Sequence, residues 1–344
     1  MATFRTPVAI PVFPWKTGYR EKQLFIGSCF TENIGERMAE LKFDTDINPC
    51  GILYNPVSAG NCLRMLLEKK QLSAGDLFQR GGMWHSFSHH SRFSAETAEK
   101  ALEQINTRLE QSSRFLEQAG FLFLTFGTAW IYEWKATGQV VANCHKLPAS
   151  GFRRFRLSVA EITGLYRDLL TDLWTVNPGL KVVFTVSPVR HWSDGATENQ
   201  LSKATLLLAI DALLRGFGTE RCAYFPSYEM VMDELRDYRF YAEDMLHLSP
   251  VAVQYIWEAF SAALIGAESH EVLREVQNIL RAVAHRPFNK KSDEYLKFCL
   301  NSLQTVSGLA DRFPGIDLSA EKDYFLRQID EFGNRKEQMT VDAS

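Results

Sequence analysis

The sequence lacks the features that mark membrane proteins, disulfide-stabilised proteins and proteins that bind polyanions. No segment is apolar over the length needed to cross a bilayer, and residues 1–20, interrupted by Pro7, Pro11 and Pro14, hold no apolar stretch of signal-peptide length. The six cysteines are scattered without a C-x-x-C pair, which disfavours a disulfide framework and a structural zinc site. The net charge of -3 gives no basic excess for nucleic acid or an anionic membrane surface. We therefore expect a cytoplasmic protein with reduced thiols that binds neither nucleic acid nor membranes.

Three short apolar runs each end in a cluster of small or polar residues. The runs cover residues 24–26, 121–126 and 182–186, and they precede the segments GSCF, GTAW and SPVRHW. Unalternated runs of this length suit strands that are buried on both faces of a parallel sheet. Helix-like segments follow each run, directly or after a loop. The chain therefore reads as an α/β fold, and its 344 residues are enough for a large domain with an appendage.

Helix signals lie between these runs. Apolar residues recur at helical spacing over residues 34–41, directly after GSCF. Ser158 and Glu161 form a capping-box pattern, and the turn sequence NPG at residues 177–179 ends that helix before the next strand. Ser249–Pro250 is an N-cap and first-turn pair ahead of a further apolar stripe. This alternation of strand and helix is what a parallel sheet requires.

The strand signals stop near Gly266. Residues 1–265 are predicted to form the α/β domain, and residues 266–344 a helical extension. Within the extension, helices are expected around residues 273–283, 295–303 and 324–329. We expect that these helices can mediate self-association.

The residues that could carry chemistry follow from this layout. Ligands of an open parallel sheet bind beyond the carboxyl ends of its strands, so the three clusters are expected to meet at one rim. Ser28 and Cys29 stand at the first strand-to-helix turn, where backbone N–H groups favour a thiolate or an oxyanion. Asp244 and His247 precede the Ser249–Pro250 helix start, and a carboxylate three residues from a histidine can reach Nδ1 and leave Nε2 for a nucleophile. The alternative is that Asp244 caps a turn and His247 lies on the surface.

This order of segments resembles the SGNH or GDSL hydrolase superfamily and, within it, the GSCFA family. The matching stretches include FIGSCFTENIG, NPCGILYNP, TFGTAWIY, VANCHKLP, TVSPVRHWSDGATENQLSKA and YAEDMLHLSP, and they cover roughly residues 20–265. The resemblance implies a three-layer, flavodoxin-like fold. It also implies hydrolytic or acyl-transfer chemistry through an acyl-enzyme on a small or carbohydrate-linked acyl ester.

The superfamily's G-D-S-L-T block, laid on GSCFT without gaps, places Cys29 on the nucleophilic serine, whereas a shift by one residue would make Ser28 the nucleophile. A thiolate is expected to form readily at Cys29. The resemblance implies oxyanion donors from the nucleophile's own N–H group, from Gly51 and from a G-x-N block. Thr128 stands where that block has its Asn, and Asn143 either substitutes for it or serves turn chemistry.

The remaining candidates are expected to contact substrate. Arg190, His191 and Trp192 end a core strand; His191 is a rival base, and Arg190 could bind a carboxylate or phosphate. Trp84 is expected in a lid or substrate wall, together with His85 and His89. These two histidines lack an acidic third ligand nearby, so we expect no metal, and we expect no cofactor. The missing Asn also motivates a second hypothesis, a non-catalytic protein that binds a carbohydrate or metabolite.

Overall fold

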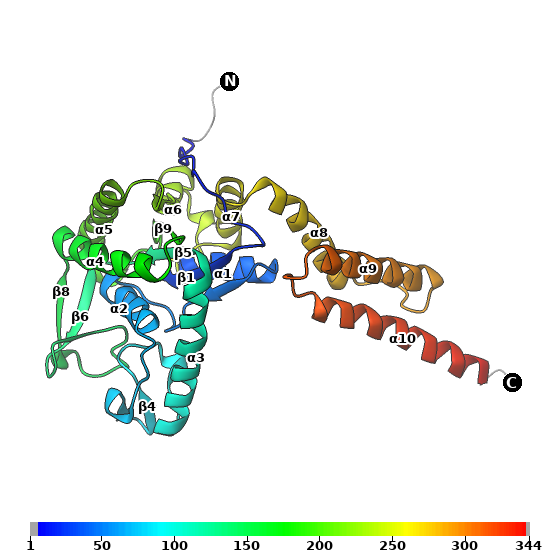
Figure 1. Ribbon diagram of the computed structural model, residues 1–344, viewed down its shortest axis with the longest axis horizontal. Coiled ribbons are helices and arrows are strands. Elements are labelled where there is room, and N and C mark those ends of the chain that lie inside the picture. Colours follow the sequence, from blue (N-terminus) through cyan, green and yellow to red (C-terminus); the bar gives the residue numbers. More distant parts are fainter. Residues whose placement is uncertain (1–5, 342–344) are drawn as a thin grey trace. The chain divides into compact units, whose positions relative to one another are not determined.

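The computed structural model describes the backbone of residues 6–341 and the side chains of residues 6–333 (Figure 1). It forms two compact units. The first contains residues 6–17, 21–37 and 45–264. The second contains Gly18–Arg20, Met38–Asp44 and residues 265–341.

The first unit is built on a parallel five-stranded sheet with the strand order β10-β9-β5-β1-β2. This is the doubly wound order of flavodoxin-like folds, in which the order reverses between the first strand and its next central neighbour. The reversal here lies between β1 and β5. The strands are β1 (Lys22–Gly27), β2 (Thr45–Ile47), β5 (Ala119–Phe126), β9 (Lys181–Val186) and β10 (Cys222–Tyr224).

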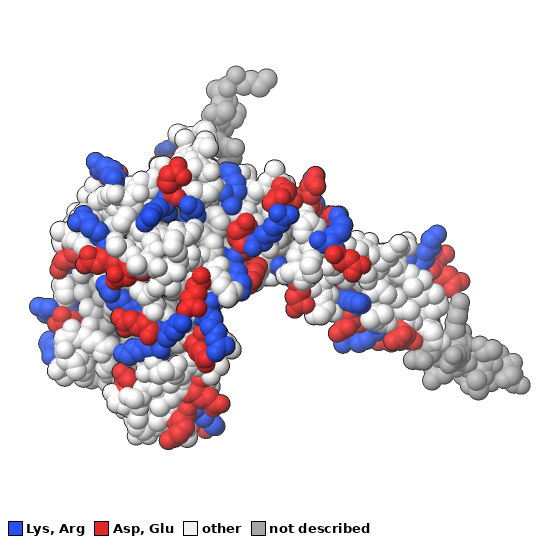
Figure 2. Space-filling view, viewed as in Figure 1, with Lys and Arg blue, Asp and Glu red and all other residues white. Residues whose placement is uncertain are grey.

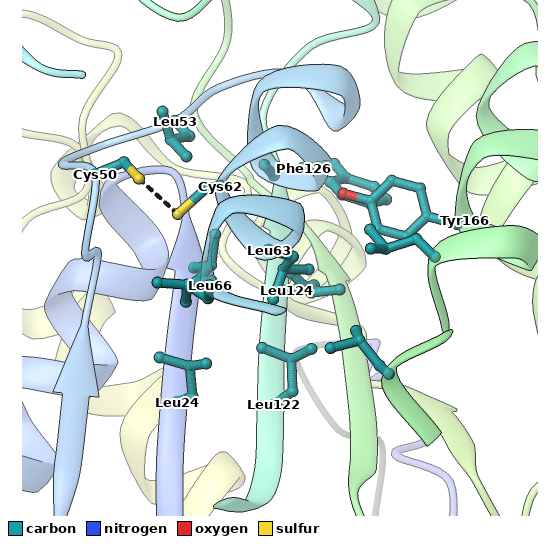
Figure 3. Close-up of a cluster of buried hydrophobic side chains, with 14 of the residues drawn as sticks. Leu24, Cys50, Leu53, Cys62, Leu63, Leu66, Leu122, Leu124, Phe126 and Tyr166 are labelled. Carbon is teal, nitrogen blue, oxygen red and sulfur yellow. Dashed lines mark hydrogen bonds between the residues drawn. The ribbon is translucent and has the colours of Figure 1, made fainter. Parts of the chain in front are cut away.

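One face of the sheet packs against four helices. Alternate strand residues such as Leu24, Leu122 and Leu124 point to this side and are fully buried (Figure 3). The ring of Tyr166 packs on Phe126 with centroids 5.0 Å apart, and its hydroxyl donates to a backbone carbonyl of the helix beside it. The helices on this face are α2 (Pro56–Leu67), α3 (Ala98–Gln118), α4 (Val159–Val176) and α5 (Ala196–Phe217).

The opposite face carries the intervening strand residues. Phe25 stacks on Phe123 with ring centroids 4.5 Å apart, and Phe123 contacts Phe260 at 5.4 Å. Phe260 belongs to α7 (Pro250–Leu264), and the first helix, α1 (Cys29–Glu40), covers the same side. Helices therefore cover both faces of a parallel sheet, and the predicted three-layer α/β fold is confirmed.

The predicted helix signals are present as local contacts. Ser158 is the N-cap of α4, where its hydroxyl accepts the N–H of Glu161 and the Glu161 side chain accepts the N–H of Ser158. The hydroxyl of Ser249 accepts the N–H of Ala252 at the start of α7. Such caps contribute about 1 kcal/mol each because they satisfy N–H groups that a helix start leaves unpaired.

The first unit also contains short antiparallel strands, which the apolar runs did not predict. β3 (Phe78–Arg80) pairs with β4 (Met83–His85). β6 (Trp130–Trp134) pairs with both β7 (Gln139–Val141) and β8 (Phe152–Arg156). After β10 the chain forms a short helix, α6 (Ser227–Glu229), that continues into a π-helical turn at residues 230–234.

The second unit contains the predicted C-terminal helices. These are α8 (Ala267–Ala284), α9 (Asp293–Arg312) and α10 (Ser319–Val341). They share a core of their own, in which Val276, Val306 and Phe325 are fully buried. Lys42 forms an ion pair with Glu321 at 2.7 Å inside this unit.

Candidate active site

Cys29 is the first residue of α1 and follows β1 after a single intervening residue. At the end of β1, Gly27 pairs with Thr125 of β5, and a Cβ atom on Gly27 would lie 2.3 Å from the Thr125 carbonyl oxygen. Only glycine permits this close approach. Cys29 therefore stands at the carboxyl edge of the sheet where the strand order reverses, the position at which doubly wound folds bind ligands.

The Cys29 thiol is partly exposed, and its pKa is raised. Burial is the largest cause; the backbone N–H groups of Cys29 and Phe30 and the charge of Lys203 act in the opposite direction. The expectation that a thiolate forms readily at this turn is wrong, because desolvation outweighs the helix N-terminus. A neutral thiol needs a base to remove its proton when it attacks.

Ser28 differs from Cys29 in accessibility. It is 1% exposed, and its hydroxyl has no hydrogen-bond partner among residues 6–333. Its backbone carbonyl accepts the N–H of Glu32, so the residue caps α1 from inside the fold. Ser28 is therefore less accessible to a substrate than the partly exposed Cys29.

Asp244 and His247 form the predicted pair. His247 Nδ1 lies 2.5 Å from Asp244 Oδ2, and Asp244 Oδ1 accepts the backbone N–H groups of Leu246 and His247, each at 2.9 Å. The His247 hydrogen bonds are the main reason why the pKa of Asp244 falls to about 2. Both side chains are about half exposed. The carboxylate fixes the imidazole by Nδ1, so Nε2 is the atom left for proton transfer.

His191 lies on the same rim beside the residue that follows β5. Its Nε2 is 3.2 Å from the position that a Cβ on Gly127 would occupy, and its ring contacts Tyr54 edge-on at 5.6 Å. Burial, followed by the charge of Lys203, lowers the pKa of His191 to about 4, and a charged His247 acts in the same direction. His191 is therefore a neutral imidazole at pH 7, close enough to His247 to sense its charge.

Tyr54 lies near both the His191 ring and the Cys29 thiol. Burial raises the pKa of Tyr54, and the negative charge of a Cys29 thiolate is the next cause. No carboxylate accepts a hydrogen bond from the His191 ring within residues 6–333. The comparison favours His247 as the base, because it alone of these two imidazoles has an orienting carboxylate.

A buried lysine hydrogen-bonds to backbone carbonyls of the two segments that follow β5 and β9. Lys203 of α5 is 0% exposed, and its Nζ donates to the backbone carbonyls of Gly127 at 2.6 Å, Ser187 at 2.6 Å and Val189 at 2.9 Å. An ammonium group has three N–H donors, and all three are used. The contact joins the segments that follow β5 and β9. Burial lowers the pKa of Lys203 to about 7, and the charge of a Cys29 thiolate acts in the opposite direction.

A cavity of about 840 Å³ borders the Asp244–His247 pair. Asp244 belongs to its lining, and so do Arg190 and Trp192 from the segment after β9. The structure therefore brings these two predicted substrate residues to the same cavity as the predicted orienting acid.

A model described as the GSCFA family matches residues 22–260. The chain belongs to the GSCFA family. Residues 276–331 of this GSCFA chain match a second model, described as the GSCFA domain protein, C-terminal domain. The family's eponymous motif thus coincides with the turn that carries Cys29.

Solved structures similar to this GSCFA protein include two carbohydrate-active esterases. A carbohydrate esterase family 3 protein from Talaromyces cellulolyticus is 10% identical, with a TM-score of 0.33 over 75% of this chain and 99% of the other. The acetyl xylan esterase Est2A from the rumen bacterium Butyrivibrio proteoclasticus is 12% identical, with a TM-score of 0.35 over 79% of this chain and 66% of the other. No curated protein matches the chain.

Two further properties describe the helices and the surface of the GSCFA chain. Within the part of the chain that the structure describes, no helix is both long and apolar enough to span a membrane. Acidic and basic side chains are interspersed over the face shown in Figure 2, without a broad area of one sign.

The two oxyanion donors inferred from the resemblance are already engaged. The N–H of Gly51 donates to the Asn48 carbonyl at 2.8 Å. The Thr128 hydroxyl accepts the N–H of Trp130 at 3.1 Å and hydrogen-bonds to the Ser202 hydroxyl at 3.0 Å. Both groups therefore take part in local contacts, and either hydroxyl can be the donor between Thr128 and Ser202.

The side chains of Asn143 and Trp84 also have local roles. The side-chain Oδ1 of Asn143 accepts the backbone N–H of His145. This is the turn contact that was the alternative to a role as an oxyanion donor. Trp84 lies in β4 and packs against the main core, away from the cavity beside Asp244. His85 and His89 bond separately, to the hydroxyls of Ser94 and Ser86, and β4 ends at His85, so their four-residue spacing is not helical.

The structure adds two residues that the motifs did not reveal. Lys203 lies on the buried stripe of α5 with Asn199, Leu206 and Ile210, and a lysine in such a stripe is the signal that could have identified it. Asn48 follows β2, and its Oδ1 accepts the N–H of Gly27 at 2.9 Å while its buried Nδ2 has no partner among residues 6–333.

Proposed function

We propose that this GSCFA protein is an ester or thioester hydrolase, or an acyltransferase, that forms an acyl-enzyme on Cys29. The observation that carries the proposal is the hydrogen bond between Asp244 and His247. A charge on His247 lowers the pKa of His191, which lies on the rim beside Gly127. Cys29 stands at the strand-order reversal, and the proposal requires that His247 Nε2 reach its sulfur. Placement in the SGNH or GDSL superfamily is part of the proposal, supported by the strand order and by the nucleophile after β1.

Each residue has a defined step. His247 Nε2 removes the Sγ proton as the Cys29 sulfur attacks the carbonyl carbon of the substrate, and Asp244 stabilises the resulting imidazolium. The tetrahedral intermediate collapses, its bond to the leaving alkoxide or thiolate breaks, and the imidazolium protonates the leaving group. Water or an acceptor alcohol then attacks the thioester and gives its proton to His247. The bond between the carbonyl carbon and Sγ breaks, and the imidazolium returns the proton to the Cys29 thiolate.

The oxyanion is assigned to the N-terminus of α1. The N–H groups of Cys29 and Phe30 face the Cys29 sulfur, and helix N-termini favour negative charge. Asn48 is our candidate for a further donor, because its Nδ2 is buried beside Gly27 without a partner in the described part of the chain.

Intact-mass analysis after incubation with an activated acyl ester tests the nucleophile. We expect one acyl adduct, mapped to Cys29, in the wild type, in Ser28→Ala and in Cys144→Ala, a matched control because Cys144 is the other partly exposed cysteine. Cys29→Ala should carry none. His247→Ala should slow acylation by about 10²–10⁴-fold, the usual contribution of a general base. Labelling of Ser28 in place of Cys29 would reverse the assignment.

A second candidate function has its own supporting observation. The N–H of Gly51 donates to the Asn48 carbonyl, and Thr128 stands where the superfamily's G-x-N block has its Asn. A protein that binds a carbohydrate or metabolite without turnover would need neither group as an oxyanion donor. It should show a raised Tm with the ligand and no product, whereas turnover that His247→Ala abolishes would exclude it.

A further inference from the structure

The cavity beside the Asp244–His247 pair has the size and lining of a small-molecule site. Its volume of about 840 Å³ falls within the range of about 300–1,000 Å³ that such sites occupy. Trp192, Tyr241 and Met232 give it an aromatic and apolar wall, and Trp192 is 53% exposed. Burying this surface under a hydrocarbon group would be favourable.

The carboxylates at the cavity are already compensated. Asp244 accepts hydrogen bonds from His247 Nδ1 and from two backbone N–H groups. Asp237 forms an ion pair with Arg239 at 3.4 Å and also accepts the Arg239 backbone N–H. Neither carboxylate pairs with the arginine side chains of the lining.

Two arginines line the cavity, and Arg190 is the one with a buried side-chain nitrogen that has no partner; the Nε of Arg236 donates to the Asp233 carbonyl at 2.7 Å. Arg190 forms no ion pair within residues 6–333; its Nη2 contacts the Met232 sulfur at 3.4 Å, and its buried Nε has no hydrogen-bond partner there. A thioether is a weak acceptor, so the guanidinium keeps its capacity to bind an anion. The backbone before it is fixed, because the carbonyls of Ser187 and Val189 accept from Lys203.

We infer that the substrate is an ester with a carboxylate group, which Arg190 binds while the hydrocarbon part lies on Trp192, Tyr241 and Met232. The inference rests on the proposed function and deepens it. The planar fork of a guanidinium matches a carboxylate in two parallel hydrogen bonds. The carboxylate can belong to the acyl chain or to the leaving alcohol.

Two pairs of probes separate these sources. Mono-4-nitrophenyl adipate and 4-nitrophenyl hexanoate differ by a carboxylate on the acyl chain, and 4-acetoxybenzoate and its methyl ester differ by a carboxylate on the leaving group. For at least one pair we expect kcat/KM of the wild type to favour the charged ester by roughly 10- to 100-fold, as charge-assisted hydrogen bonds do.

Variants locate the effect. Arg190→Gln should bring this ratio close to one, and Arg190→Lys should retain part of it because the charge remains. Arg215→Gln is the matched control, since Arg215 lies on α5, is exposed and pairs with Asp211; it should keep the wild-type ratio. A wild-type ratio near one for both pairs, or an unchanged ratio in Arg190→Gln, overturns the inference.

Binding to the Cys29→Ala variant separates this inference from the proposed function. Calorimetry compares monomethyl adipate with methyl hexanoate, and 4-acetoxybenzoate with its methyl ester. Tighter binding of a charged member that Arg190→Gln removes supports the carboxylate site even if no ester is turned over, in which case only the proposed function fails. Equal binding within both pairs overturns the carboxylate site whatever the activity.

Discussion

Replacing Lys203 by methionine should destabilise the first unit. The substitution keeps an unbranched side chain of similar length but leaves the carbonyls of Gly127, Ser187 and Val189 without their donor. Hydrogen bonds to a charged group contribute about 1.5–3 kcal/mol each, and losing the cost of burying an ammonium offsets part of the sum. We expect the free energy of unfolding to fall by roughly 3–5 kcal/mol, because three buried carbonyls lose their donor at about 1–3 kcal/mol each and removal of the buried amine offsets only part of this.

Calorimetry should show this loss as a decrease in Tm of about 10 °C, at roughly 2–4 °C per kcal/mol for a unit of this size. Lys181→Met is the matched control: its exposed Nζ donates to one surface carbonyl, that of Glu220, at 2.9 Å. The control should change stability by less than about 1 kcal/mol. In Lys203→Met the pKa of the Cys29 thiol should also rise, because the Lys203 charge lowers it. A Tm within about 2 °C of the control would refute the proposed bracing.

Three further changes test individual features. Burial raises the Cys29 pKa above its ordinary value of 9.0, so alkylation by iodoacetamide, followed by mass spectrometry, should be slow at pH 7 and still accelerate beyond pH 9; a plateau already at pH 7 would contradict this. Burial also lowers the pKa of His89 to about 4. As the pH falls, His89 is therefore protonated in the unfolded state before it is protonated in the folded state. On the order of 3 kcal/mol of the free energy of unfolding should be lost between pH 6.5 and 4. Urea unfolding of His89→Gln should show a weaker pH dependence over that window, and an equal dependence would sink the assignment. In Gly51→Ala the new Cβ would lie 2.2 Å from the His90 Cβ at a φ of +84°, whereas the new Cβ in Gly81→Ala meets nothing within 4 Å at a φ of +57°. In urea unfolding, Gly51→Ala should therefore lose more stability than Gly81→Ala, by roughly 1–3 kcal/mol. Equal losses would show that the contact with His90 relaxes freely.

Local signals predicted the fold well because they act over a few residues. The capping box of Ser158 and Glu161 needs only the chain around it, and the apolar runs report burial on both faces of the sheet. The same logic placed Cys29 at the start of α1 and paired Asp244 with His247.

Features that depend on distant partners were not predictable in this way. Whether the N–H of Gly51 is free depends on a carbonyl that only the folded turn presents, and the role of Lys203 depends on two loop segments from other parts of the chain. The pKa of Cys29 likewise reflects how deeply the packed helices bury it, which no motif encodes.

The loop that carries His247 is closed on itself. The N–H of Ala242 donates to the His247 carbonyl at 2.8 Å, and the N–H of Ser249 donates to the Phe240 carbonyl at 2.9 Å. The Asp244 carboxylate fixes the imidazole from within the same closed loop. If His247 is the base, wall residues such as Met232 and Tyr238 can be exchanged to change which molecules enter without disturbing the pair that transfers the proton.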